Sequence, residues 1–175
     1  IGRVYLDPNH NSRRDRGEGG SGESLFVKLV PVGNSNLAPR VTTVNPTTGL
    51  YRFDNVAPGD YRLVLDDNND LADDTPSLPA GFVNTEAPEG SRTLRVGQVA
   101  NGSQNFGLFA GSVVDIEVFA DTGADAGGDG GVANNAAREA GEPGLTNARV
   151  EVRRGGSVLA AATTGDSGQL RLWVP

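Results

Sequence analysis

The chain of 175 residues contains no cysteine and no methionine, and it has a single histidine. Without cysteine it can form no disulfide, no thiolate nucleophile and no structural zinc site of the usual kind. A serine nucleophile usually needs a neighbouring histidine, and His10 stands in a polar stretch of a chain that has no G-x-S-x-G turn. We therefore expect that the chain is not an enzyme.

Basic residues and long apolar runs are also scarce. The chain has 15 basic and 22 acidic residues, which gives a formal net charge of −7. Nucleic-acid binding depends on clustered Lys and Arg, so cations are the expected partners and nucleic acid is not. No apolar run approaches the roughly 20 residues that span a bilayer, and no signal peptide begins the sequence, so no transmembrane segment is expected in this piece.

The abundant turn residues predict an all-β fold. With 25 glycines, 10 prolines and only 6% aromatic residues, the chain favours short strands joined by many turns. Up to Phe109 about seven runs are rich in β-branched and aromatic residues or alternate between apolar and polar residues, a count typical of an immunoglobulin-like or transthyretin-like sandwich. The expected strands are RVYL, SLFVKLV, RVTTV, LYRF, YRLVL, RTLRV and QNFGLF.

Alternation along these strands predicts the core. Because successive side chains of a strand point to opposite faces, Lys28, Arg52, Asp54 and Arg62 are expected to point to solvent. The residues expected in the core are Leu25, Val27, Leu29, Tyr51, Phe53, Tyr61, Leu63, Leu65, Phe106 and Leu108.

The sequence contains two copies of one unit. VYLDPN, DRGEGGSG and SLFVKLV return as VFADTG, EAGEPGLT and NARVEVR, and TTGLYRF returns as DSGQLRL. The boundary falls near residue 111, which predicts one domain over 1–110 and the N-terminal part of a second over 111–175. The second copy has no counterparts of YRLVL, RTLRV and QNFGLF. We expect missing strands to come from chain beyond Pro175 or, less favoured, from a neighbouring molecule.

An acidic loop follows the first strand. Its residues match the offsets of a twelve-residue calcium loop, in which alternate residues aim oxygens at one cation. The three arginines of the loop weaken binding, so an affinity on the order of 10⁻⁴–10⁻³ M is expected. The alternative is a metal-free turn in which Asn and Asp bond their own backbone. The ligands expected for Ca²⁺ are Asp7, Asn9, Asn11, the Arg13 carbonyl, Asp15 and Glu18.

Two further acidic clusters are candidate metal sites. The first cluster directly follows the YRLVL strand in the sequence and is either a second metal site or a solvated acidic loop. The second lies in the second copy, where a glycine-rich insertion breaks the spacing of the acidic residues. This cluster is either another metal site or part of a flexible insertion that binds no metal. The candidate ligands are Asp66, Asp67, Asn68, Asp70, Asp73 and Asp74 in the first cluster, and Asp121, Asp125, Asp129, Glu139 and Glu142 in the second.

The order of these motifs resembles a known family. D-x-N-x-N, D-x-G-E, then G-x-Y-x-F-x-x-V-x-P-G-x-Y over residues 49–61, LPAGF and NFGLF are similar to the B-type repeat of the serine-aspartate surface adhesins, a relative of the collagen-adhesin B-type and transthyretin-like modules. The resemblance covers nearly all of 1–110 and, more loosely, 111–175. One departure is Ser12, which stands where the family usually has glycine.

The resemblance implies a calcium-stabilised sandwich in an extracellular protein of the bacterial cell surface. Such a repeat acts as a stalk or spacer and in some cases as a binding surface, and the partners that the resemblance implies are neighbouring repeats of the same chain and other surface proteins. The alternative is a transthyretin-like accessory module of a larger secreted enzyme or outer-membrane assembly. Some relatives carry an isopeptide bond between a lysine and an asparagine. None is expected here, because Lys28, the only lysine, is predicted to point outward and Leu65 stands where those relatives have the assisting glutamate.

Overall fold

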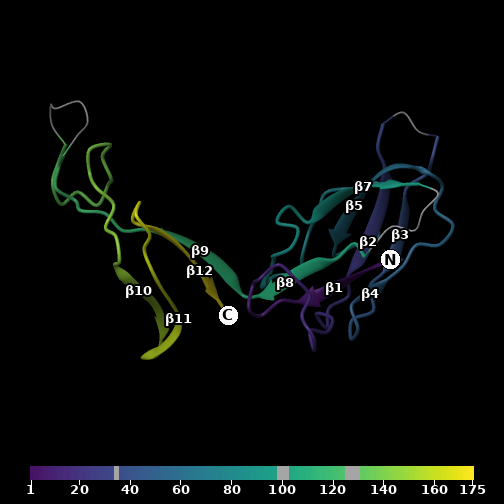
Figure 1. Cartoon of the computed structure of the whole chain (residues 1–175), viewed down its shortest axis with the longest axis horizontal. Coiled ribbons are helices and arrows are strands. Elements are labelled where there is room, and N and C mark those ends of the chain that lie inside the picture. Colours follow the sequence, from purple (N-terminus) through teal and green to yellow (C-terminus); the bar gives the residue numbers. More distant parts are fainter. Residues whose placement is uncertain (34–35, 98–102, 125–130) are drawn as a thin grey trace. The chain divides into compact units, whose positions relative to one another are not determined.

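The chain folds into strands and turns arranged as two compact units. The computed structural model describes residues 1–33, 36–97, 103–124 and 131–175, and these residues contain strands but no helix (Figure 1). Consequently, none of the described residues forms a helix that could span a membrane. The first unit is Ile1–Ala110 and the second is Gly111–Pro175. The all-β prediction is confirmed.

The first unit contains two four-stranded sheets. One sheet has the order β4-β1-β8-β6 and the other has the order β3-β2-β5-β7. Most neighbours are antiparallel, but β1 and β8 run parallel, with Val4 opposite Phe106 and Leu6 opposite Leu108. The strands are β1 (Gly2–Leu6), β2 (Phe26–Pro31), β3 (Arg40–Thr43), β4 (Leu50–Tyr51), β5 (Gly59–Asp66), β6 (Phe82–Asn84), β7 (Ser91–Val96) and β8 (Phe106–Ala110).

One hydrophobic core lies between these sheets, as in a β-sandwich. Residues from β1, β4 and β8 of one sheet pack with residues from β2 and β5 of the other. All ten residues predicted for the core belong to it, nine of them buried and Phe53 partly buried. The seven expected strands correspond to seven of the eight observed. The sequence analysis missed only β6, whose three residues are too few to show an alternating pattern.

The second unit contains two two-stranded sheets, β9-β12 and β10-β11. β9 pairs antiparallel with β12, and β10 pairs antiparallel with β11. An isolated bridge joins Phe119 to Gly144. The strands are β9 (Ser112–Glu117), β10 (Arg149–Arg154), β11 (Ser157–Thr163) and β12 (Gln169–Val174).

Strand registers in the two units correspond. Phe26 lies opposite Thr43 in the first unit, and Arg149 lies opposite Thr163 in the second. The β1–β4 and β9–β12 pairs agree in the same way. The Val4 amide donates to the Gly49 carbonyl, and the Val118 amide donates to that of Gly168. In the β1–β4 ladder Arg3 lies opposite Leu50, and at the matched position of the β9–β12 ladder Glu117 lies opposite Gln169. In the same way, the Gly2–Tyr51 pair of the first unit corresponds to the Ile116–Leu170 pair of the second.

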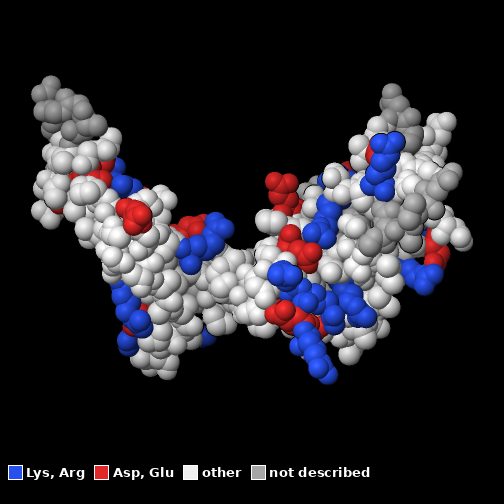
Figure 2. Space-filling view, in the orientation of Figure 1, with Lys and Arg blue, Asp and Glu red and all other residues white. Residues whose placement is uncertain are grey.

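Charged side chains of both signs lie on the surface of the protein. In Figure 2, blue and red side chains lie interspersed on the face in view. Cross-strand pairing accounts for some of this pattern: Arg171 on β12 lies opposite Asp115 on β9 and donates to both of its carboxylate oxygens, at 2.7 and 3.0 Å. Such exposed pairs contribute at most about 1 kcal/mol each.

Candidate cation-binding loops

Residues 7–18 form a loop that closes on the buried carboxylate of Asp7. Asp7 follows β1, and its amide donates to the carbonyl of Leu108 at 2.7 Å. Its side chain is fully buried and accepts the amides of Asn11 at 3.0 Å and Ser12 at 2.9 Å, one at each oxygen. The loop is therefore curled around its first predicted ligand.

The other predicted ligands contact one another farther out in the loop. Asp15 accepts the side-chain amides of Asn9 at 3.0 Å and Asn11 at 2.8 Å, and these two hydrogen bonds lower the pKa of Asp15. Glu18 accepts the Asp15 amide at 2.7 Å. The Arg13 amide donates to Asn11 Oδ1 at 2.8 Å. These are the contacts of the Asx-rich turn, and they link Asn9 and Asn11 to Asp15, and Asp15 to Glu18.

Ser12 makes the turn that glycine would make more easily. Its φ is +59°, in the left-handed region that costs an L-residue energy. Two hydrogen bonds hold it there, one from its amide to Asp7 and one from its hydroxyl to the carbonyl of Thr85 at 2.9 Å. Nearby, His10 also has a positive φ of 44°, and its exposed ring lies edge-on to Phe109 with 6.1 Å between centroids.

The second unit contains a loop with similar hydrogen bonds around Asp121, although its two amide donors are two residues apart and those to Asp7 are adjacent. One oxygen of Asp121 accepts the amide of Asn134 at 2.5 Å, and the other accepts the amide of Ala136 at 2.9 Å. Ala136 has a φ of +61°, close to that of Ser12. Asn135 donates to Glu139 at 2.6 Å, as Asn11 does to Asp15. The insertion therefore lies between Asp121 and the rest of the loop and leaves the loop's contacts in place.

Three carboxylates converge in this second loop. Asp121, Glu139 and Glu142 each offer an oxygen, and these oxygens all lie within 4.8 Å of one another. Among the described residues this is the one such group of three, so Asp7, Asp15 and Glu18 are not brought together in this way. Asp125 and Asp129, the other two predicted ligands, lie outside the described residues.

Two features mark these carboxylates as electrostatically unusual. Glu142 is buried, and burial raises its pKa, but hydrogen bonds from the amides of Gly123 and Glu139 outweigh burial and hold the pKa below its ordinary value. Glu139 Oε2 is buried and has no hydrogen-bond donor among the described residues. Amides therefore stabilise the Glu142 carboxylate, whereas one buried oxygen of Glu139 has no donor among the described residues.

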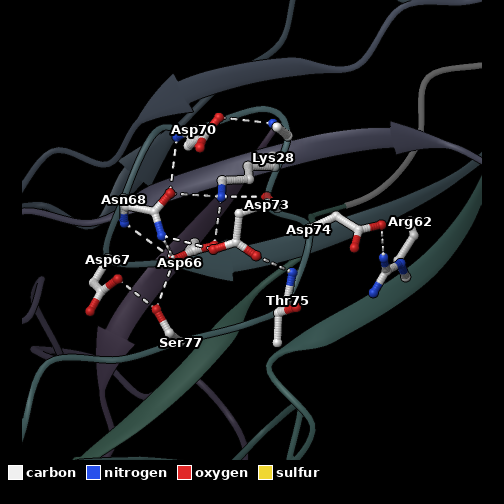
Figure 3. Close-up of polar contacts among 11 residues, drawn as sticks. Lys28, Arg62, Asp66, Asp67, Asn68, Asp70, Asp73, Asp74, Thr75 and Ser77 are labelled. Carbon is white, nitrogen blue, oxygen red and sulfur yellow. Dashed lines mark hydrogen bonds and ion pairs between the residues drawn. The ribbon is translucent and has the colours of Figure 1, made fainter.

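The acidic cluster that begins at Asp66 has a cation of its own, the ammonium of Lys28. Lys28 Nζ lies 2.6 Å from Asp66 Oδ2, 2.7 Å from the carbonyl of Asp73 and 3.1 Å from Asn68 Oδ1 (Figure 3). Both members of the Lys28–Asp66 pair are buried, with side chains 1% and 0% exposed. The three acceptors use all three N–H donors of the ammonium.

The other residues of the cluster form hydrogen bonds and ion pairs around the Lys28–Asp66 pair. The Ser77 hydroxyl lies 2.8 Å from Asp66 Oδ1 and 2.5 Å from Asp67 Oδ1, so its single proton bonds one carboxylate at a time, and the hydrogen bond to Asp67 lowers the pKa of Asp67. The pKa of Asp73 is lowered first by the amide of Thr75 and also by Asn68 and Lys28. The remaining predicted ligands lie at the rim: Asp70 accepts the Ala72 amide, and Asp74 pairs with Arg62 on β5 at 2.5 Å.

The prediction that Lys28 points to solvent is wrong, although its face was correctly assigned. Lys28 lies opposite Val64 on the outer face of the β2–β5 pair, away from the core. That face is covered by the loop that follows β5, so both Lys28 and Val64 are buried. The signal was present in the LVL run of residues 63–65, because an apolar residue at the outward position indicates a covered face. The role of Lys28 was missed for this reason.

No protein-family model matches the chain, and no curated protein matches it.

Proposed function

We propose that this chain is a structural segment of a bacterial cell-surface protein, a stalk or spacer built from two copies of one β-sandwich unit. Each copy would hold a calcium ion in the loop after its first strand. The ligands would be the six predicted residues of the first loop and Asp121, Glu139 and Glu142 in the second. The resemblance to the B-type repeat supports the surface location, and a mixed-sign surface is compatible with a role that does not involve nucleic acid.

The relation between the two units rests on matched positions. The two strand pairs of the second unit have the registers of β1–β4 and β2–β3, and the loop after the first strand shares three of its hydrogen bonds in the two units. Gly49 and Gly168 both have positive φ, of 69° and 78°, and a Cβ on either would collide with a carbonyl of the first strand. Two unrelated segments would not be expected to share all of these details.

The observation that carries the calcium proposal is the carboxylate group of the second unit. Three carboxylates within 4.8 Å repel one another unless a cation lies among them, and the buried oxygen of Glu139 has no donor in the described structure. Ca²⁺ accepts six to eight oxygens in flexible geometry, and carboxylates are its common ligands. A weak site of the extracellular class would be filled where calcium is abundant and would stiffen the loop there.

Thermal unfolding in calcium and in chelator tests this function. A site present only in the folded state adds RT ln(1 + [L]/Kd), about 1.4–2.7 kcal/mol at ten to a hundred times Kd. Trp173 is the only tryptophan and lies in the second unit, so its fluorescence reports that unit. We expect the melting temperature of the second unit to rise when calcium is added and not when NaCl is added to the same ionic strength.

Glu139→Gln supplies the sharper comparison. In chelator this variant should be as stable as the parent or more stable, because one of three mutually repelling charges is removed. In calcium it should lose most of the stabilisation. Asp166→Asn, a change at an exposed carboxylate of the same unit, is the matched control and should keep the full response. An equal rise in parent and Glu139→Gln, or no rise in the parent, would refute the site.

A further inference from the structure

Arginines without a carboxylate partner gather at one place in the first unit. Most other basic side chains form an ion pair within the described structure, but no basic residue of β1 or of the loop after it does so. In Figure 2, blue side chains gather where Figure 1 shows the purple loop after β1, with red side chains among them. The arginines concerned are Arg3 on β1 and Arg13, Arg14 and Arg16 in the loop.

Local contacts hold two of these arginines at the same end of the loop. Arg3 Nη1 donates to the carbonyl of Thr48 at 2.6 Å, in a turn that also accepts the amide of Gly20 just after the loop. Arg14 Nη2 donates to the carbonyl of Glu18 at 3.0 Å, so this side chain is turned back toward the same end. The side chains of the other two arginines are exposed.

The carboxylates of the loop are engaged by amides of the loop itself. Asp7 is buried and accepts two backbone amides. Asp15 accepts the side-chain amides of two asparagines, and Glu18 accepts the Asp15 amide. A guanidinium has five N–H donors in a planar fork that matches the oxygens of a phosphate or carboxylate group. The loop therefore presents donors and positive charge that the described protein does not pair with a carboxylate.

The matched loop of the second unit shows that these arginines are not needed to fold the loop. Ala137 and Ala140 stand where the first loop has Arg13 and Arg16, and the second loop still forms the three shared hydrogen bonds. The one arginine of the second loop, Arg138, pairs with a glutamate of β9. The unpaired arginines are thus an addition to the loop and not a requirement of its fold.

The loop offers charge and hydrogen bonds but no apolar anchor. Residues 8–17, PNHNSRRDRG, contain no Leu, Ile, Val, Phe, Tyr or Trp. Protein partners usually dock on apolar or aromatic anchors, and the bases of single-stranded nucleic acid stack on aromatic rings. The ring of His10 already contacts Phe109. The net charge of −7 does not prevent anion binding here, because charges more than about 8 Å apart are largely screened at physiological salt.

We propose that Arg3, Arg13, Arg14 and Arg16 form a binding surface for a linear polymer of phosphate or phosphodiester groups that carries no bases. Such a polymer is recognised through its charge and its phosphate oxygens alone, which is what this surface can contact. The proposal goes beyond the stalk role by naming a ligand for the first unit. It does not depend on the calcium sites.

Fluorescence anisotropy of end-labelled inorganic polyphosphate, titrated with the full chain in chelator, tests the surface. We expect the affinity to fall with salt with a log–log slope of about −2 to −3, because each of three or four phosphate contacts contributes about 0.7. Arg13→Ala with Arg16→Ala reproduces the residues of the second loop. This double variant should bind about tenfold more weakly or worse, with a slope shallower by about 1.4. Its urea unfolding should match that of the parent.

Arg149→Ala with Arg153→Ala is the matched control. It changes the net charge equally but removes arginines that already pair with Glu151, so it should bind polyphosphate as the parent does. Equal losses in the two double variants would overturn the proposal, as would no binding by the parent at low salt. Tighter binding of single-stranded DNA with the same number of phosphates, or of polyglutamate with the same charge, would also overturn it. Because every titration is made in chelator, a failed calcium response would leave these results unchanged.

Discussion

Replacing Lys28 with methionine should destabilise the first unit strongly. Methionine keeps much of the length and apolar stem of lysine but removes the ammonium. Asp66 Oδ1 would keep two donors from Asn68, the main-chain amide at 3.2 Å and the side-chain amide at 2.9 Å. Asp66 Oδ2 would lose Lys28, the one donor to that oxygen that the described contacts provide. A buried carboxylate would then have no opposing charge.

The magnitude follows from this geometry. Removing one partner of a buried ion pair typically costs about 3–5 kcal/mol, because the other charge stays buried without compensation. A domain is usually stable by about 5–15 kcal/mol, so the variant should lose about a fifth or more of its stability. The double variant Lys28→Met with Asp66→Asn removes both charges and should recover much of the loss.

Urea unfolding at neutral pH, followed by tyrosine fluorescence, measures the effect. The three tyrosines, Tyr5, Tyr51 and Tyr61, all lie in the first unit. Arg62→Met is the matched control: it removes a cation from the same cluster, but its pair with Asp74 is partly exposed and should contribute no more than about 1 kcal/mol. A loss below about 1 kcal/mol for Lys28→Met would refute the conclusion that this ammonium holds the cluster together.

Three further predictions concern other parts of the fold. Burial and the hydrogen bond to Glu86 raise the pKa of Tyr5 above its ordinary value near 10, so the folded state keeps a proton that the unfolded state releases, and stability should fall as pH rises above about 10. Tyr5→Phe should reduce that alkaline slope in a pH series of urea unfolding curves. Gly49→Ala and Gly168→Ala should each destabilise their own unit by more than about 1 kcal/mol, seen in tyrosine and tryptophan fluorescence respectively, because each places a Cβ against a carbonyl at positive φ. The Lys28 contacts should be ionic, so the intact mass should equal the sequence mass, and a deficit of one ammonia or one water would show a covalent link instead.

Most of the fold could be predicted because the core strands are half-buried. The alternation in YRLVL and NFGLF reflects one face toward the core and one away from it, and every predicted core residue belongs to the observed core. β6 could not be found because three residues carry no period. The outward face of β2 was misjudged because alternation identifies a face and does not say what covers it. For Lys28 the cover is a loop whose contacting residues, Asn68 and Asp73, lie 40 and 45 residues farther along the chain.

The candidate sites were predictable in part. Spacing identified the loop of residues 7–18, because Asn and Asp at alternate positions bond the local backbone whether or not a cation binds. The grouping of Asp121 with Glu139 and Glu142 was predicted from the similarity between the two halves of the sequence, and the structure brings these three carboxylates together. Spacing alone could not show that the insertion leaves the contacts of Asp121 with residues 134 and 136 intact. The electrostatic role of Lys28 depends on tertiary packing and had no local motif.

The parallel pairing of β1 with β8 has a mechanical consequence. Gly2 lies at the N-terminal end of β1, and Ala110 lies at the C-terminal end of β8, so tension along the polypeptide pulls these adjacent strands in opposite directions. The hydrogen bonds between them run across the direction of pull and are loaded together, in shear, instead of opening one at a time as in an unzipped hairpin. We expect the first unit to resist a pulling force applied at its two ends. The same force applied across the open ends of a hairpin should separate the strands far more easily.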